Sequence, residues 1–223
     1  MKDITMTADA PEVATASVPV TLAPEQVRYF LSREPQKREL YYAALRAVAD
    51  AAEPFALRRP DLTGAMAACP QASSMHQSLG TLVDALVTQG LLEAREPEPA
   101  YDEAADEEIV DVSLTAYALT EAGHAATHDF APVSRLATLL SEEPEHRDRF
   151  CDLLAFCSEA PRSRQDVDGL LNDYCAAIPT KFSVAAQGLY PSYFTDRLEK
   201  CGALVWEGGW RTTEAGRSVL TAH

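Results

Sequence analysis

The sequence has no apolar run approaching the roughly 18 residues that a membrane-spanning helix needs. It starts Met1-Lys2-Asp3 and continues in Thr, Ala and Pro, so it shows no apolar core of a signal peptide. Its five cysteines are odd in number and widely scattered, which excludes a disulfide framework. We therefore expect a cytoplasmic protein with reduced thiols and no membrane partner.

The motifs of common enzyme chemistries are missing as well. The ten glycines form neither a dinucleotide fingerprint nor a phosphate-binding loop, and no Gly-x-Ser-x-Gly elbow is present. The acidic cluster Asp102–Asp111 lacks the central glycine of a calcium loop. His124 and His128 have the spacing of two metal ligands, but no further ligand pattern accompanies them, so a surface or packing role is favoured. We predict a protein that is not an enzyme and needs no cofactor or metal.

Basic residues are absent from one long stretch, and this absence dominates the charge pattern. The net charge is −15, and residues 96–129 carry ten acidic groups without a single Lys or Arg. Residues 24–95, in contrast, carry equal numbers of basic and acidic groups, eight of each. Such a block is usually a solvated loop, and otherwise it repels anions or binds a basic partner.

What is present suits a globular protein of two small domains. The 223 residues are 47% hydrophobic, enough to fill a core. Residues 1–23 show no sustained period and are predicted to be a flexible tail. Regular structure should begin at Pro24-Glu25, since Pro fits a first helical turn and Glu favours a helix start. The predicted domains are residues 24–130, with a long acidic insertion, and residues 131–223.

A repeat supports this division. The first half contains Leu86-Val87-Thr88-Gln89-Gly90-Leu91-Leu92 and later Thr120-Glu121-Ala122-Gly123. The second half contains Leu198-Glu199-Lys200-Cys201-Gly202-Ala203-Leu204 and then Thr213-Glu214-Ala215-Gly216. Each copy predicts a helix ended by Gly, a strand, and a helix capped by Thr. The same unit is therefore expected twice.

In the first half, apolar periodicity predicts helices at Glu39–Ala52, Asp61–Ala68 and Met75–Val87. Ser73 and Ser74 are expected to cap the third helix. Val110, Val112 and Leu114 alternate with polar residues, which predicts a half-buried strand. Mainly α structure with small β-hairpins, an α+β class, is the expectation for the whole chain.

In the second half, the corresponding helices are predicted at Arg147–Ser158, Arg164–Tyr174 and Tyr193–Cys201. The apolar stripe of the first of these includes Cys157, which is expected in the core. Leu204-Val205-Trp206, a turn at Glu207-Gly208-Gly209 and a return strand at Trp210–Thr212 predict a hairpin. Aromatic residues cluster nearby, and core packing is expected to use most of them, although a pocket or interaction face is the alternative. They are Tyr190, Tyr193, Phe194, Trp206 and Trp210.

These features resemble the winged-helix superfamily, and in the first half the PadR- and MarR-type bacterial regulators. The resemblance rests on Leu82-Val83-x2-Leu86-x3-Gly90-Leu91-Leu92-Glu93 and Tyr117-x-Leu119-Thr120-x2-Gly123. A looser form follows as Phe194-x3-Leu198-x3-Gly202-Ala203-Leu204 and Trp210-x2-Thr213-x2-Gly216. It implies two tandem winged-helix domains, with Ser73–Gln89 and Pro191–Cys201 as recognition helices and wings near 96–108 and 207–210.

The resemblance implies a DNA-binding, transcription-regulator-like protein. Its candidate nucleic-acid- or partner-binding residues are Ser74, His76, Gln77, Thr81, Ser192, Tyr193, Arg197, Lys200 and Arg211. The first candidate helix offers no Lys or Arg, however, and the first wing is strongly acidic, whereas phosphate contacts need cations. The alternative is a non-catalytic interaction or scaffold module, analogous to the acidic tandem winged-helix subunits that bind kleisins in bacterial SMC complexes. DNA, a protein partner and a second copy in a homodimer are the partners considered.

Overall fold

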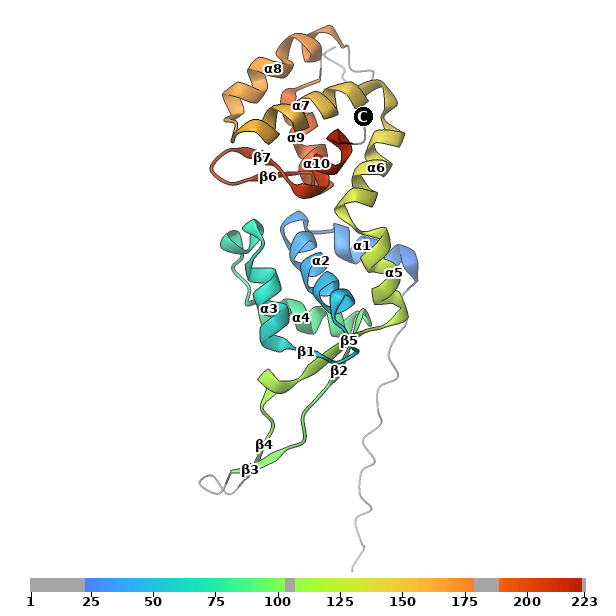
Figure 1. Cartoon of the computed structure of the whole chain (residues 1–223), viewed down its shortest axis with the longest axis vertical. Helices are drawn as coiled ribbons and strands as arrows, with labels where there is room; N and C mark the ends of the chain where they lie inside the picture. The colour runs from blue at the N-terminus through green and yellow to red at the C-terminus, as the bar shows by residue number, and fades with distance from the viewer. Residues whose placement is uncertain (1–22, 103–106, 179–188, 222–223) are drawn as a thin grey trace, which may run out of the picture.

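The computed structural model describes residues 23–102, 107–178 and 189–221 (Figure 1). It is mainly helical with small antiparallel sheets, which confirms the α+β class. Helix α1 begins at Pro24, as predicted. The predicted tail lies outside the described residues except for Ala23.

The first half consists of helices packed against a three-stranded sheet. Strand β5 is central and pairs with β1 and β2, both antiparallel, while β3 and β4 pair only with each other among the described strands. The helices are α1 (Pro24–Ser32), α2 (Pro35–Asp50), α3 (Arg59–Ala67), α4 (Leu79–Thr88) and α5 (Glu121–Asp129). The strands are β1 (Leu57–Arg58), β2 (Leu92–Arg95), β3 (Ala100–Asp102), β4 (Glu107–Ile109) and β5 (Ala116–Leu119), and two short 3-10 turns are η1 (Pro70–Ser74) and η2 (Val112–Leu114).

The start of α4 differs from the prediction. Ser73 and Ser74 belong to η1, where their hydroxyls donate to the carbonyl oxygens of Pro70 and Gln71. The cap is Ser78, whose hydroxyl accepts a hydrogen bond from the Thr81 backbone N–H. The prediction was wrong because Ser73 and Ser74 satisfy local turn carbonyls instead of helix N–H groups.

The prediction of a strand from the alternation of Val110, Val112 and Leu114 is also wrong, because Val112–Leu114 form the 3-10 turn η2. The strand that returns to the sheet is β5, further along the chain, and the three apolar side chains are exposed. A turn forms instead at η2, where the Asp111 carboxylate accepts a hydrogen bond from the Ser113 backbone N–H.

The second half repeats the order of elements. Trp210 of β7 pairs with β6 on one side and forms an isolated bridge to Arg162 on the other. The helices are α6 (Pro132–Glu142), α7 (Arg147–Glu159), α8 (Arg164–Ala177), α9 (Pro191–Lys200) and α10 (Glu214–Leu220), with a 3-10 turn η3 (Pro144–His146). The strands β6 (Leu204–Trp206) and β7 (Trp210–Thr212) form the predicted hairpin. Helix α6, which the repeat did not predict, follows α5 and leads into the second half.

The repeated Thr-Glu-Ala-Gly performs the same task twice. The Thr120 hydroxyl accepts from the Gly123 backbone N–H and donates to the Gly90 carbonyl oxygen at 2.6 Å. Thr213 makes the equivalent bonds with Gly216 and Gly202, the latter at 2.7 Å. The predicted caps are confirmed. The motif ends in Gly because a Cβ there would collide with a backbone carbonyl of the preceding strand region.

The buried apolar residues form two clusters. The first runs from Val27 to Phe130 and the second from Leu136 to Leu204, with Cys157 in the second as expected. Of the five aromatic residues noted above, Phe194 is buried and Tyr193 and Trp210 pack against the core, while Tyr190 and Trp206 are exposed. Each half therefore has its own core.

Candidate functional site

Helix α4 presents a narrow exposed face, because Leu82, Val83 and Leu86 point into the first core. Its exposed residues are Thr81, Asp84 and Thr88, preceded by the cap Ser78. Of the predicted site residues in this half, only Thr81 lies on the helix. Ser74 ends η1, and His76 and Gln77 are exposed in the loop between η1 and α4.

A carboxylate occupies this face. The guanidinium of Arg59, at the start of α3, pairs with Asp84 through both terminal nitrogens, and one of them also donates to the Gly80 carbonyl oxygen at 3.3 Å. The hydrogen bond to Asp84 raises the pKa of Arg59. The contact joins α3 to α4, and it neutralises a cation that could otherwise meet a phosphate.

Helix α9 carries two predicted cations, and both are paired with acids. The Arg197 guanidinium lies 3.2 Å from the Glu143 carboxylate, which also accepts a hydrogen bond from the Tyr193 hydroxyl. The Lys200 ammonium lies 2.6 Å from Asp196 one turn earlier. In the hairpin, the predicted Arg211 lies 3.5 Å from Glu207.

A groove of about 550 Å³ runs beside α9, bounded by α8 and by Trp210 of β7. Three carboxylates line it, those of Asp168, Asp196 and Glu199, against the single guanidinium of Arg164. Burial, and then the neighbouring Asp196, raise the pKa of Glu199. The predicted Ser192 lies at the same groove. The groove thus favours cationic over anionic ligands.

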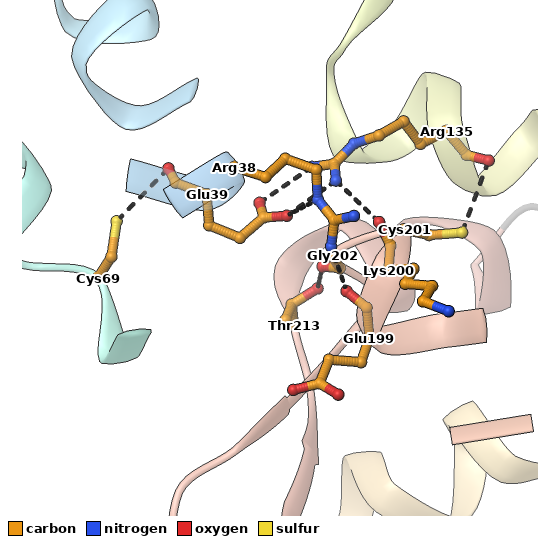
Figure 2. Close-up of polar contacts among 9 residues, drawn as sticks. All are labelled: Arg38, Glu39, Cys69, Arg135, Glu199, Lys200, Cys201, Gly202 and Thr213. Atoms are coloured by element: carbon orange, nitrogen blue, oxygen red, sulfur yellow. Dashed lines mark hydrogen bonds and ion pairs between the residues drawn. The ribbon is translucent and has the colours of Figure 1, made fainter. Parts of the chain in front are cut away.

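A polar cluster joins the two halves at the end of α9 (Figure 2). Arg135 of α6 donates to both carboxylate oxygens of Glu39 on α2, at 2.8 and 2.9 Å, and Arg38 donates to the same carboxylate at 3.0 Å. Arg38 also donates to the Glu199 carbonyl oxygen at 3.1 Å, and Arg135 to that of Lys200 at 3.0 Å. Two cations therefore satisfy carbonyls at the C-terminus of α9, where the helix dipole is negative.

The cluster is largely buried. The side chains of Arg38, Arg135 and Glu39 are 5%, 11% and 12% exposed. Gly202 lies against it with φ +75°, and a Cβ there would approach the Arg135 and Glu39 side chains to 3.1 Å. No sequence signal identified this cluster, because Glu39 and Arg135 are 96 residues apart.

Within the described residues, no group of three or more His, Cys, Asp or Glu side chains could hold a metal ion. His124 and His128 are both exposed on α5. Burial raises the pKa of the Cys157 and Cys201 thiols to about 11, which keeps both protonated at neutral pH.

No protein-family model matches the chain, and neither does any curated protein or solved structure. No helix in the described part of the chain is long and apolar enough to cross a membrane.

Proposed function

We propose that this chain is a tandem winged-helix protein that acts as a non-catalytic protein-interaction module. The order of elements supports the winged-helix part. In the first half, helix, strand, two helices and two further strands give a sheet with β5 between β1 and β2. In the second half, Trp210 occupies the same central place between Arg162 and β6.

One observation carries the choice of a protein partner: no unpaired cation faces outward from α4 or α9. The exposed face of α4 holds Asp84, and each cation of α9 lies against a carboxylate. A DNA-binding surface needs several cations that can displace counterions from phosphates. The groove beside α9 instead offers the carboxylates of Asp168 and Glu199 to a basic protein segment, since Asp196 already pairs with Lys200.

DNA reading is the second candidate, and the exposed polar groups of His76, Gln77 and Thr81 support it. Neutral polar side chains can hydrogen-bond base edges. If this surface reads DNA, replacing His76 and Gln77 together with Ala should weaken binding to an operator selected from random sequence. Stability should then change by no more than about 0.5 kcal/mol, since both residues are exposed.

The test uses the full chain in two assays. In the first, fluorescence anisotropy of a labelled random-sequence duplex should show no binding at protein concentrations up to about 100 µM at physiological salt, the weak end of non-specific binding. In the second, the tagged chain is purified from its native host with nuclease treatment, and the protein that stays bound is purified and titrated back. We expect a basic partner whose association slows about tenfold in Asp168→Lys, through lost electrostatic attraction.

Asp173→Lys is the matched control, since Asp173 is exposed on the same helix but does not line the groove. Equal effects of the two variants would show that only net charge matters, and would remove the groove from the proposal. Tight duplex binding, with no protein partner left after nuclease, would favour the DNA-binding alternative.

A further inference from the structure

We infer that a cleft between the two halves is a binding site for a small organic cation with an apolar body. The cleft has a volume of about 670 Å³, and both halves line it. One wall consists of α2, the end of α3 and η1, and the other of α6, β6 and α10. Four of its lining residues appear in Figure 2: Glu39 and Cys69 from the first half, and Gly202 and Thr213 from the second.

The cleft stays open because small side chains line it. The buried apolar residues of each half form a separate cluster, so neither core fills the space between them. Five lining residues are alanine or glycine, namely Ala43, Ala47, Ala65, Ala215 and Gly202. Clefts of roughly 300–1,000 Å³ between domains are preferred places for small ligands.

One edge of the cleft is fixed in position. Glu39 lines it, and the Arg135 guanidinium of the second half holds that carboxylate at 2.8 and 2.9 Å. Beyond Cys69 and Pro70, a further hollow of about 880 Å³ extends the space to Trp206 of β6. The walls are therefore in place before a ligand arrives, which lowers the entropic cost of binding.

The apolar body of the ligand follows from the side chains on the second wall. Val133 at the start of α6 is 49% exposed, although it is a large hydrophobic residue. Val205 of β6 is half-buried at the same cleft. A ligand with an apolar body would remove these groups from water, which is favourable in proportion to the apolar area covered.

The positive charge of the ligand follows from the ion pairs at the cleft, where four charged residues form the lining. The Arg46 guanidinium lies 2.6 Å from Asp50, and Glu39 accepts hydrogen bonds from both terminal nitrogens of Arg135. Glu214, at the start of α10, is the remaining one, and it forms no ion pair within the described residues. Because Glu214 is exposed, we place the cationic group of the ligand at the mouth of the cleft.

The experiment measures the binding of three naphthalene probes to the full chain by equilibrium dialysis, with naphthalene fluorescence as the readout. The probes are 2-naphthylmethylamine, 2-naphthylmethanol and 2-naphthoate, which carry a positive, a neutral and a negative group on the same ring. At about pH 7 and about 150 mM salt, we expect one saturable site for the amine. The amine should bind about threefold more tightly than the alcohol, the gain typical of an exposed ion pair, and the carboxylate should bind most weakly.

Two pairs of variants test the two parts of the site. Ala47→Leu fills the cleft and should weaken binding of the amine at least about tenfold, whereas Ala49→Leu, on the exposed side of the same helix and outside the cleft, should leave it unchanged. If Ala47→Leu does not fold, Val133→Trp fills the cleft from the other wall. Glu214→Gln should make the amine and the alcohol bind equally, whereas Glu121→Gln, at the same position of the first Thr-Glu-Ala-Gly, should keep the preference.

Binding that is indifferent to Ala47→Leu and Val133→Trp would overturn the site, as would the absence of saturable binding of the amine. Tighter binding of the carboxylate than of the amine would overturn the charge of the ligand. A dimer in sedimentation that Ala47→Leu dissociates would show a second copy in the cleft and would also overturn the site. The proposed function is independent of these results, because it fails only if duplex DNA replaces protein as the ligand.

Discussion

The Arg135 guanidinium, in the second half of the chain, donates hydrogen bonds to both carboxylate oxygens of Glu39 in the first half, at 2.8 and 2.9 Å. Arg38 shares the same carboxylate. One buried acid thus compensates two buried guanidinium groups, and both of these also bind the end of α9. The cluster makes the junction between the halves sensitive to a single side chain.

Glu39→Gln should lower the free energy of unfolding by about 3 kcal/mol, because it leaves two buried cations without a counter-charge. Urea denaturation measures the loss. Glu34→Gln is the control, since Glu34 is 42% exposed and pairs with Lys37 at the surface, so it should cost less than about 1 kcal/mol. Equal losses in the two variants would mean that the junction cluster contributes no more than a surface pair.

Gly202→Ala and Gly208→Ala separate backbone strain from crowding. Both glycines have positive φ, +75° and +70°, so each Ala should cost about 1 kcal/mol or more. A Cβ at Gly208 meets open space, whereas one at Gly202 presses on the Arg135 and Glu39 side chains. Thermal denaturation should therefore show a larger loss for Gly202→Ala, and equal losses would contradict the crowding at the junction.

Thr120→Ala and Thr213→Ala should each cost about 1–2 kcal/mol, since each removes a helix cap. Each Thr hydroxyl also bonds the carbonyl of the glycine that ends the preceding helix. Ser at either position should restore most of the loss. Thr138→Ala serves as the control, because its exposed hydroxyl only donates back to Ser134 within α6. A large loss from the control with none from the caps would refute the repeated role of these residues.

The free energy of unfolding should fall at alkaline pH because the thiols of Cys157 and Cys201 are buried. Burial raises the pKa of Cys157 and Cys201 from 9.0 to about 11, so the folded state keeps these protons at a pH where the unfolded chain releases them. The contribution is complete below about pH 9 and is lost as the pH rises towards about 11. Urea titrations of Cys201→Ala should show a flatter alkaline decline than the parent chain, and parallel declines would contradict the assignment.

Local signals predicted most of the helices and the two threonine caps, because Gly-terminated helices and Thr N-caps depend on residues a few positions apart. The alternation of Val110, Val112 and Leu114 misled for a physical reason. Period two indicates one apolar face, but only a packing partner determines whether that face is buried. No local pattern indicated the junction cluster, since Arg135 lies 96 residues from Glu39 and only the tertiary structure brings the two together.

Anchoring of the α9 C-terminus by Arg38 and Arg135 also couples the two halves of the chain mechanically. Arg38 of α2 donates to the Glu199 carbonyl oxygen, while Glu39 beside it accepts two hydrogen bonds from Arg135 of α6. A force that pulls the halves apart must break these contacts together. The halves should therefore separate in one step and not by gradual loosening.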